Sequence, residues 1–345
     1  MRYAETIKSL GAPVLAIAIA LAFGALLIEV AGFSSVEAYS EMWTGIFGSM
    51  RNFSEVLLKA TPLILIGAGL AISFRSGVWN IGAEGQFYAG GMVAAVVALQ
   101  MEGVNAWISI PVILIAASLA GAFWGGIAGF LRARYGASEI VTTIMLNYVA
   151  IILTSYLVTG PLMEAQGLFP QSDRFPQETQ LPRILSGTRL NIGIYIAIIA
   201  AIVSWYIISQ SRRGFSMRAV GASPDAARYA GINVNKNIIY SISYSGALAG
   251  LAASIELIGV TKRLFQTISP GYGFEGIAVA LLANNNPLGA IFSGALFGAL
   301  RSGAEIMQIG AGVPSVLIFI IQGLVIISVI TLGTIRAYRK LRPED

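Results

Sequence analysis

The chain has 345 residues and a formal net charge of +5 at pH 7; hydrophobic residues make up 56% of it and charged residues only 11%. Soluble domains contain about 25% charged residues, so the composition excludes an ordinary soluble protein and predicts a helical membrane protein. Cys and His are both absent, which excludes disulfides, thiol chemistry and His proton relays and leaves no predicted metal site.

Apolar stretches long enough to cross a bilayer follow one another along the chain. They predict ten spans, at residues 11–32, 56–74, 84–100, 107–131, 139–160, 190–210, 237–260, 273–284, 286–301 and 312–334. The first is interpreted as an uncleaved span because its apolar run exceeds the usual core of a signal peptide, which is the alternative. The predicted fold is therefore an all-α, polytopic integral membrane protein with a single transmembrane domain over residues 1–345.

Basic residues between the spans predict the topology by the positive-inside rule. Arg2 and Arg336 lie near opposite ends of the chain, and both ends are predicted to be cytoplasmic. The loop 161–189 is then external and the loop 211–236 cytoplasmic. An even number of crossings requires a break at "LLANNNPLG" (281–289), where Asn and Pro in series disfavour a lipid-facing helix. The positive charge is explained by orientation in the membrane, and no nucleic-acid partner is predicted.

Two segments of the chain are similar to each other. "GGIAGFLRARYGASEI" (125–140) and "GALFGALRSGAEI" (294–306) share a GxxxGxLR pattern followed by Gly-Ala and Glu-Ile. In the predicted topology the first arginine is cytoplasmic and the second external, which is typical of the inverted repeats of transporters. The alternative is chance similarity between helices rich in Gly and Ala.

Polar side chains at membrane depth are the candidate pathway. They occur in "FRSGVWNIGAEGQFYAGG" (74–91), in "SPGYGFEGIAVALLANNNPLG" (269–289) and at one Asn of the fifth span. Burying charge in a bilayer is costly and irregular backbone is tolerated only against protein or water, so broken, short helices beside a pathway are predicted. The alternatives are an interfacial loop with Glu84 capping its own helix, an aromatic belt, and interhelical hydrogen bonding. The candidate pathway residues are Asn80, Glu84, Gln86, Asn147, Tyr272, Phe274, Glu275 and Asn284.

The stretch "GASPDAARYAGIN" (221–233) has the signals of a short soluble helix. Ser223 is a good N-cap, Pro224 suits the first helical position, Asp225 lies in the first turn, and Gly231 can end the helix. So short a helix is unstable alone. It is predicted to pack on a cytoplasmic partner; the alternative is that it lies on its own protein.

The motifs together resemble one family. "RRGFSMRAVGASPDAARYAGI" is similar to the cytoplasmic coupling loop of permease subunits of bacterial ABC importers of the ribose and branched-chain amino acid type. "GVWNIGAEGQFYAGG" and "GYGFEGIAVALLANNNPLGAIFSGALFGALRSGAE" resemble more narrowly the larger permease of nucleoside (simple sugar/nucleoside) importers. With the capping residues, the candidate coupling residues are Gly214, Arg218, Gly221, Ser223, Pro224, Asp225, Ala226, Ala227, Arg228 and Gly231. For the pathway, the resemblance adds Gly82, Gly85 and Gly276 to the residues named above.

The resemblance implies a subunit that is not itself an enzyme and holds no cofactor, because a partner ABC ATPase would bind ATP. It also implies a second homologous permease, with a heterodimer preferred over a homodimer, and an external substrate-binding lipoprotein. The location would be the bacterial inner membrane. Two other functions stay open: an ion-coupled secondary transporter using Glu84 or Glu275, and a structural or sensory membrane subunit.

Overall fold

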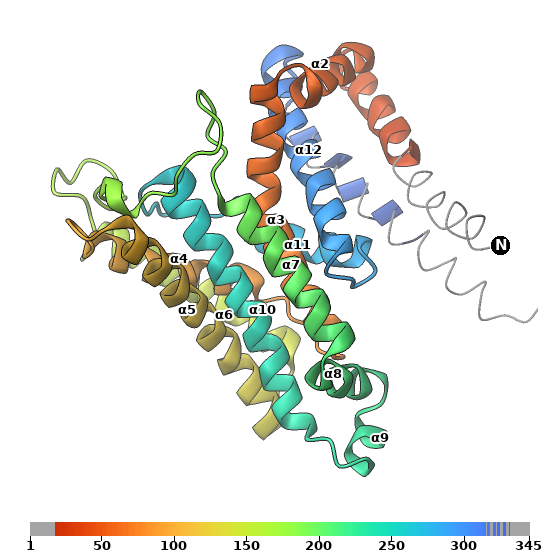
Figure 1. The fold of residues 1–345 in the computed structure, drawn as a ribbon. Coiled ribbons are helices and arrows are strands. Elements are labelled where there is room, and N and C mark those ends of the chain that lie inside the picture. The colour runs from red at the N-terminus through yellow and green to blue at the C-terminus, as the bar shows by residue number, and fades with distance from the viewer. Residues whose placement is uncertain are drawn as a thin grey trace, which may run out of the picture. The chain divides into compact units, whose positions relative to one another are not determined.

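The computed structural model describes residues 18–314 and separate positions between 316 and 331 (Figure 1). Within these residues the ordered elements are helices, and the β-bridges found are isolated ones. The chain divides into two compact units, residues 1–56 with 299–345, and residues 57–298. Each is described by itself below.

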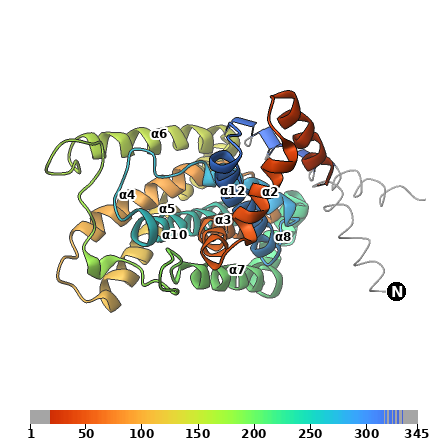
Figure 2. The same ribbon diagram turned by 90° about the horizontal axis from the view of Figure 1, so that it is seen from above.

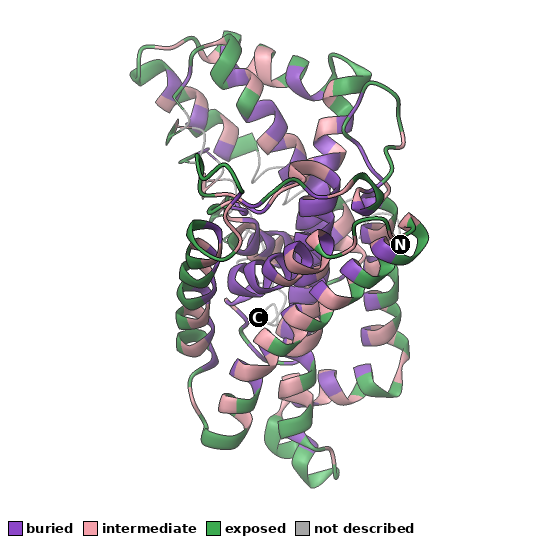
Figure 3. Ribbon diagram, turned by 90° about the vertical axis from the view of Figure 1, so that its left-hand side faces the viewer, coloured by how far each residue is buried: buried purple, intermediate pink, exposed green. Residues whose placement is uncertain are grey.

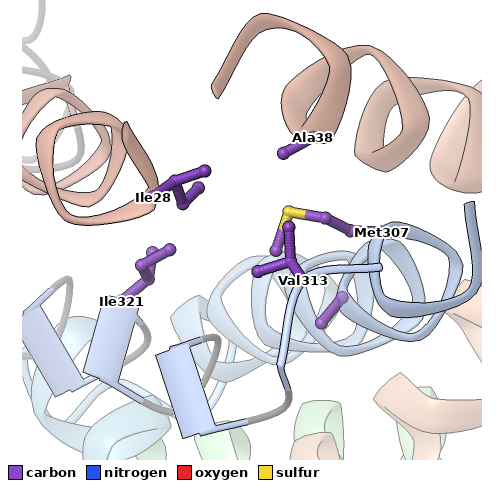
Figure 4. Packing of buried hydrophobic residues seen from close by; sticks show 6 residues of the cluster. Ile28, Ala38, Met307, Val313 and Ile321 are labelled. Atoms are coloured by element: carbon purple, nitrogen blue, oxygen red, sulfur yellow. The ribbon is translucent and has the colours of Figure 1, made fainter. Parts of the chain in front are cut away.

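The first unit contains a helix that the sequence analysis did not predict, α2 (Ser35–Phe47). Ser34 caps it, because its hydroxyl accepts a hydrogen bond from the N–H of Glu37. Ala38 on its buried face packs with Ile28, Met307, Val313 and other apolar residues in a small core (Figure 4). The first predicted span is represented by the helix Ala18–Val30. The last, 312–334, is described only at separate positions after residue 314.

The remaining helices are α3 (Met50–Arg75), α4 (Ala83–Leu99), α5 (Ala106–Tyr135), α6 (Glu139–Thr159), α7 (Gly193–Gln210), α8 (Arg212–Ala222), α9 (Pro224–Tyr229), α10 (Val234–Glu256), α11 (Tyr272–Leu282) and α12 (Gly289–Gly310). Eight of them correspond to the predicted spans from 56–74 to 286–301, although α12 continues past residue 301 to Gly310, and α8 and α9 lie in the loop 211–236. Among the described residues, five helices are long and apolar enough to span a membrane, and three apolar helices are shorter. The molecule is a multi-pass membrane protein, and the count of ten spans stays a prediction.

Helix α4 is the buried centre of the second unit. It packs against α5, α6, α10 and α11, and none of its residues is exposed. Figure 3 draws buried residues in purple. Glycines allow the backbones to touch: a Cβ on Gly250 of α10 would lie 3.2 Å from the Cα of Gly121 on α5. Such close approach is the usual role of small residues between membrane helices. Figure 2 shows α4, α5 and α10 side by side.

Helix α11 is one half of a broken segment. A π-turn, η2 (Leu257–Thr261), ends α10, and residues 262–271 then run without helix to the start of α11. At about 1.5 Å of rise per residue, the 11 residues of α11 are too short to cross a bilayer. The predicted break at 281–289 is also present: Asn284 and Asn285 take positive φ angles of 51° and 54° in the turn before α12.

The two similar segments differ locally. In the first, Gly136 ends α5 in the left-handed conformation, and Arg132 forms an ion pair of 3.2 Å with Glu139 at the start of α6. In the second, α12 continues through Arg301 and Glu305 without a turn. The inverted relationship between the halves therefore stays a prediction.

Candidate functional site

Asn80 and Gln86 form a reciprocal amide pair where the chain enters α4. The Asn80 Nδ2 donates to the Gln86 Oε1 at 3.0 Å, and the Gln86 Nε2 donates back to the Asn80 Oδ1 at 3.1 Å. Asn80 also donates to the Ser245 hydroxyl on α10 and accepts from the Gly82 N–H. Both side chains are fully buried. The pair satisfies polar groups that would be costly at membrane depth.

Asn147 attaches the same region to α6. Its Oδ1 accepts a hydrogen bond of 2.7 Å from the Gly85 N–H, and its Nδ2 donates to the Ile81 carbonyl at 3.0 Å. The first N–H groups of a helix lack intrahelical partners, so Asn147 acts as an N-cap supplied by another helix. We call Asn80, Gln86, Asn147 and Ser245 the amide network.

Glu84 joins the starts of α4 and α11. Its Oε2 accepts a hydrogen bond of 2.7 Å from the Gly273 N–H in the first turn of α11, where the helix dipole also favours a negative charge. The sequence analysis considered Glu84 as a cap for its own helix. In the structure its carboxylate accepts a hydrogen bond from the start of a different helix, α11. Next to it, the Tyr272 ring packs on the Phe87 ring with centroids 5.9 Å apart.

The structure thus gathers five of the eight candidate pathway residues around the start of α4. The other three lie on or after α11, where Glu275 is partly exposed and Phe274 is 51% exposed. Asn284 is exposed in the turn before α12. In this conformation the gathered amides form hydrogen bonds with one another, with Ser245 and with the backbone. These contacts and the Glu84 contact connect α4, α6, α10 and α11, so the site is a junction of four helices.

The predicted cytoplasmic helix is present as α9. The Ser223 hydroxyl accepts from the Ala226 N–H, and Pro224 begins the helix. Gly231 follows its end with φ of +80°. The Ile232 N–H reaches the Ala227 carbonyl at 2.9 Å, which completes a Schellman-type end.

Part of the support for α9 comes from its own chain. Ala227 is buried in a small cluster with Val220 and Val234, so its side chain is not available to a partner. Helix α8, which was not predicted as a helix, is held nearby: the Arg218 guanidinium donates to the Ile208 carbonyl at the end of α7. A Cβ on Gly214 would overlap the Ile208 carbonyl as well.

The opposite side of α9 is free surface. Ala226 is exposed, and Asp225 and Arg228 are exposed and form a weak (i, i+3) ion pair of 3.2 Å. Tyr229 is 95% exposed, the highest value among the large apolar side chains of the described residues. The candidate coupling residues therefore divide into a buried set that holds the segment and an exposed set on α9.

The predicted external loop is an ordered layer. Its Glu164 forms an ion pair of 2.7 Å with Arg263 after η2. The Phe175 N–H donates to the Lys262 carbonyl at 2.9 Å. Burial lowers the pKa of Lys262, and Arg183 and Arg174 lower it further through repulsion.

Sequence reasoning missed Ser245 and Gly273 as parts of the junction. Ser245 and Gly273 lie 165 and 189 residues from their partners Asn80 and Glu84. Small residues of this kind are frequent in packed membrane helices. No local pattern distinguishes them.

Comparison with known proteins agrees with the architecture. Residues 52–330 match the family model described as the branched-chain amino acid transport system permease component. The guanosine ABC transporter permease protein NupP of Bacillus subtilis is 40% identical over 94% of each chain. The glucose ABC transporter permease protein TsgB13 of Haloferax volcanii is 35% identical, over 95% of this chain and 89% of the relative.

The nucleoside ABC transporter permease protein NupB of Lactococcus lactis is also similar, at 32% identity over 91% of this chain and 88% of the relative. The matched segment runs from α3 into the residues after α12 and so includes both the junction at α4 and helix α9. The chain belongs to the family of permease components of the branched-chain amino acid type found in ABC transport systems.

Proposed function

We propose that this chain is the permease subunit of an ATP-driven importer that moves nucleosides or related small sugars into the cytoplasm. The observation that carries the proposal is the family membership combined with a capped helix, α9, that presents Arg228 and Tyr229 to solvent. The names of the relatives support this substrate range, because they specify guanosine, nucleosides and glucose.

A partner ABC ATPase would dock on the segment 211–236 and supply the energy. The chain itself contains no Gly-Lys dipeptide, so it cannot form the phosphate loop that binds ATP. Closure of the ATPase would move α8 and α9, and this motion would open the helix bundle alternately to the two sides of the inner membrane. Both termini are assigned to the cytoplasm.

The external layer at residues 161–189 would receive a substrate-binding lipoprotein. Arg174 and Arg183 both lie close enough to Lys262 to repel its charge, and none of the three has a carboxylate ion-pair partner within the described part of the chain. This surface favours a partner with an acidic face. A second permease of the same family would complete the complex as a heterodimer.

The test is transport by the complex reconstituted in liposomes, with radiolabelled guanosine and radiolabelled glucose as probes. We expect uptake that requires ATP and the binding protein and that is insensitive to collapse of ion gradients. Uptake by this chain alone, driven only by a proton or sodium gradient, would replace the proposal with ion-coupled transport through Glu84.

A further inference from the structure

Two glycines bring the cytoplasmic segment into backbone contact with the loop that precedes α4. A Cβ on Gly77 would lie 3.0 Å from the Cα of Gly221, at the end of α8. A Cβ on Gly221 would lie 3.0 Å from the Gly77 amide nitrogen and would overlap the Arg75 carbonyl. The two main chains therefore touch with no side chain between them.

The α8 side of this contact is firmly attached to α9. Val220, next to Gly221, packs in the same cluster as Ala227 of α9. One turn earlier, Met217 packs with Ile72 of α3 and Ile208 of α7. Because only Ala222 and Ser223 separate Gly221 from α9, a displacement of α9 reaches Gly221 through a packed core.

The loop side of the contact is equally stiff. Gly77 has φ of +73°, and the Val78 N–H returns to the Ser73 carbonyl at 3.1 Å, which closes the end of α3. The Ser73 hydroxyl bonds the Val78 carbonyl at 3.0 Å. Only Val78 and Trp79 separate Gly77 from Asn80, the first member of the amide network.

Accordingly, we propose that the Gly77–Gly221 contact is the point at which motion of α8 and α9 is transmitted to the amide network at the start of α4. Both glycines are then positioning residues for coupling, because a side chain at either one separates the two main chains. The inference rests on the proposed function, and it names the place where the ATPase cycle would act on the membrane helices.

The test compares Gly221→Ala and Gly77→Ala with two matched controls in the reconstituted complex. Gly126→Ala changes a helical glycine whose Cβ would meet only the Ser243 hydroxyl. Gly136→Ala changes a left-handed glycine (φ +68°) at a helix end with open space around it, so it matches the backbone strain at Gly77. The measured quantity is guanosine or glucose uptake per ATP hydrolysed.

We expect both test variants to hydrolyse ATP while uptake per ATP falls about threefold to thirtyfold, with the ratio unchanged in both controls. Parallel loss of hydrolysis and uptake, with the ratio constant, would overturn the proposal and leave the glycines a packing role. Failure of the unmodified complex to show any ATP-dependent uptake would count against the proposed function instead.

A second measurement covers the case in which the alanine variants do not assemble. The chain has no Cys, so Ser245→Cys places a single thiol beside Asn80, with both glycines retained. We expect its maleimide labelling rate to differ between the nucleotide-free and ATP-trapped complex. Equal rates in the two states, alongside a change at an exposed reporter next to Gly221 such as Ala222→Cys, would show that the motion stops before the network.

Discussion

Asn147 reaches from α6 to the backbone of Gly85, and its Oδ1 accepts the Gly85 N–H at 2.7 Å. The same amide donates to the Ile81 carbonyl at 3.0 Å. One side chain therefore satisfies two main-chain groups at the start of a helix in which no residue is exposed.

Replacement of Asn147 by Leu should destabilise the protein. The change keeps the size of the side chain but leaves a buried N–H and a buried carbonyl without this partner, at a cost of about 1–3 kcal/mol for each group. Denaturant titration of the purified protein measures the loss. Tyr148→Leu is the control, since Tyr148 is 58% exposed on the same helix; equal stability of the two variants would contradict the capping role.

Glu84→Gln should preserve transport to within about twofold, whereas Glu84→Ala should abolish most of it. The reason is that Gln keeps an oxygen that can accept the Gly273 N–H, while Ala leaves that donor buried and unpaired. Uptake of labelled substrate by the reconstituted complex provides the measurement. Loss of transport in Glu84→Gln as well would indicate that ionisation itself is required, as in ion-coupled transport.

The helices were predictable because their signals are local. Apolar runs set the limits of α5 and α6 to within a few residues, and Ser223, Pro224 and Gly231 set those of α9. Helix α2 was missed because its 13 residues, which alternate apolar with charged and polar types, fall short of a span.

The candidate site was only partly predictable. The cost of burying polar groups identified Asn80 and Glu84 as unusual, but it could not identify their partners on α10 and α11. The Gly77–Gly221 contact forms because neither residue has a side chain to keep the two main chains apart. In the sequence, these two glycines look the same as a glycine in any turn and a glycine in any helix. Contacts between residues so far apart in the sequence are determined by how the helices pack, and a local sequence pattern does not contain that information.

The external layer should loosen at acid pH. The hydrogen bond from Gln171 contributes most to lowering the pKa of Glu164 below its usual 4.5, and Arg263 and the Phe169 N–H add to it against the effect of burial. Because the folded-state pKa is the lower one, this stabilisation is present above about pH 4.5 and is lost as the pH falls through the folded value.

Hydrogen exchange of the segment 161–189, measured between pH 3 and pH 6 after correction for intrinsic rates, checks this expectation. We expect protection to fall at the acid end in the unmodified protein. Glu164→Gln should show weaker protection at pH 6 and little further change on acidification. A pH response of the same size in both proteins would assign the effect to other groups.

Tyr229→Ala should reduce coupling to the ATPase without affecting the fold of this chain. Tyr229 is 95% exposed, and substitutions at such positions usually change stability by less than about 0.5 kcal/mol. If the ring is an anchor for the partner, its removal should weaken ATPase binding by about 1–3 kcal/mol, or roughly fivefold to a hundredfold. Binding of the purified ATPase to the permease in nanodiscs measures this directly.

The matched control is Tyr135→Ala, because Tyr135 is also strongly exposed, at 71%, beside a different turn assigned to the cytoplasm. Its removal should leave ATPase binding unchanged. Equal affinities for Tyr229→Ala and the unmodified chain would mean that the exposed face of α9 is not the docking surface. A loss in Tyr135→Ala alone would move that surface to the turn between α5 and α6, where Arg132 and Glu139 already pair.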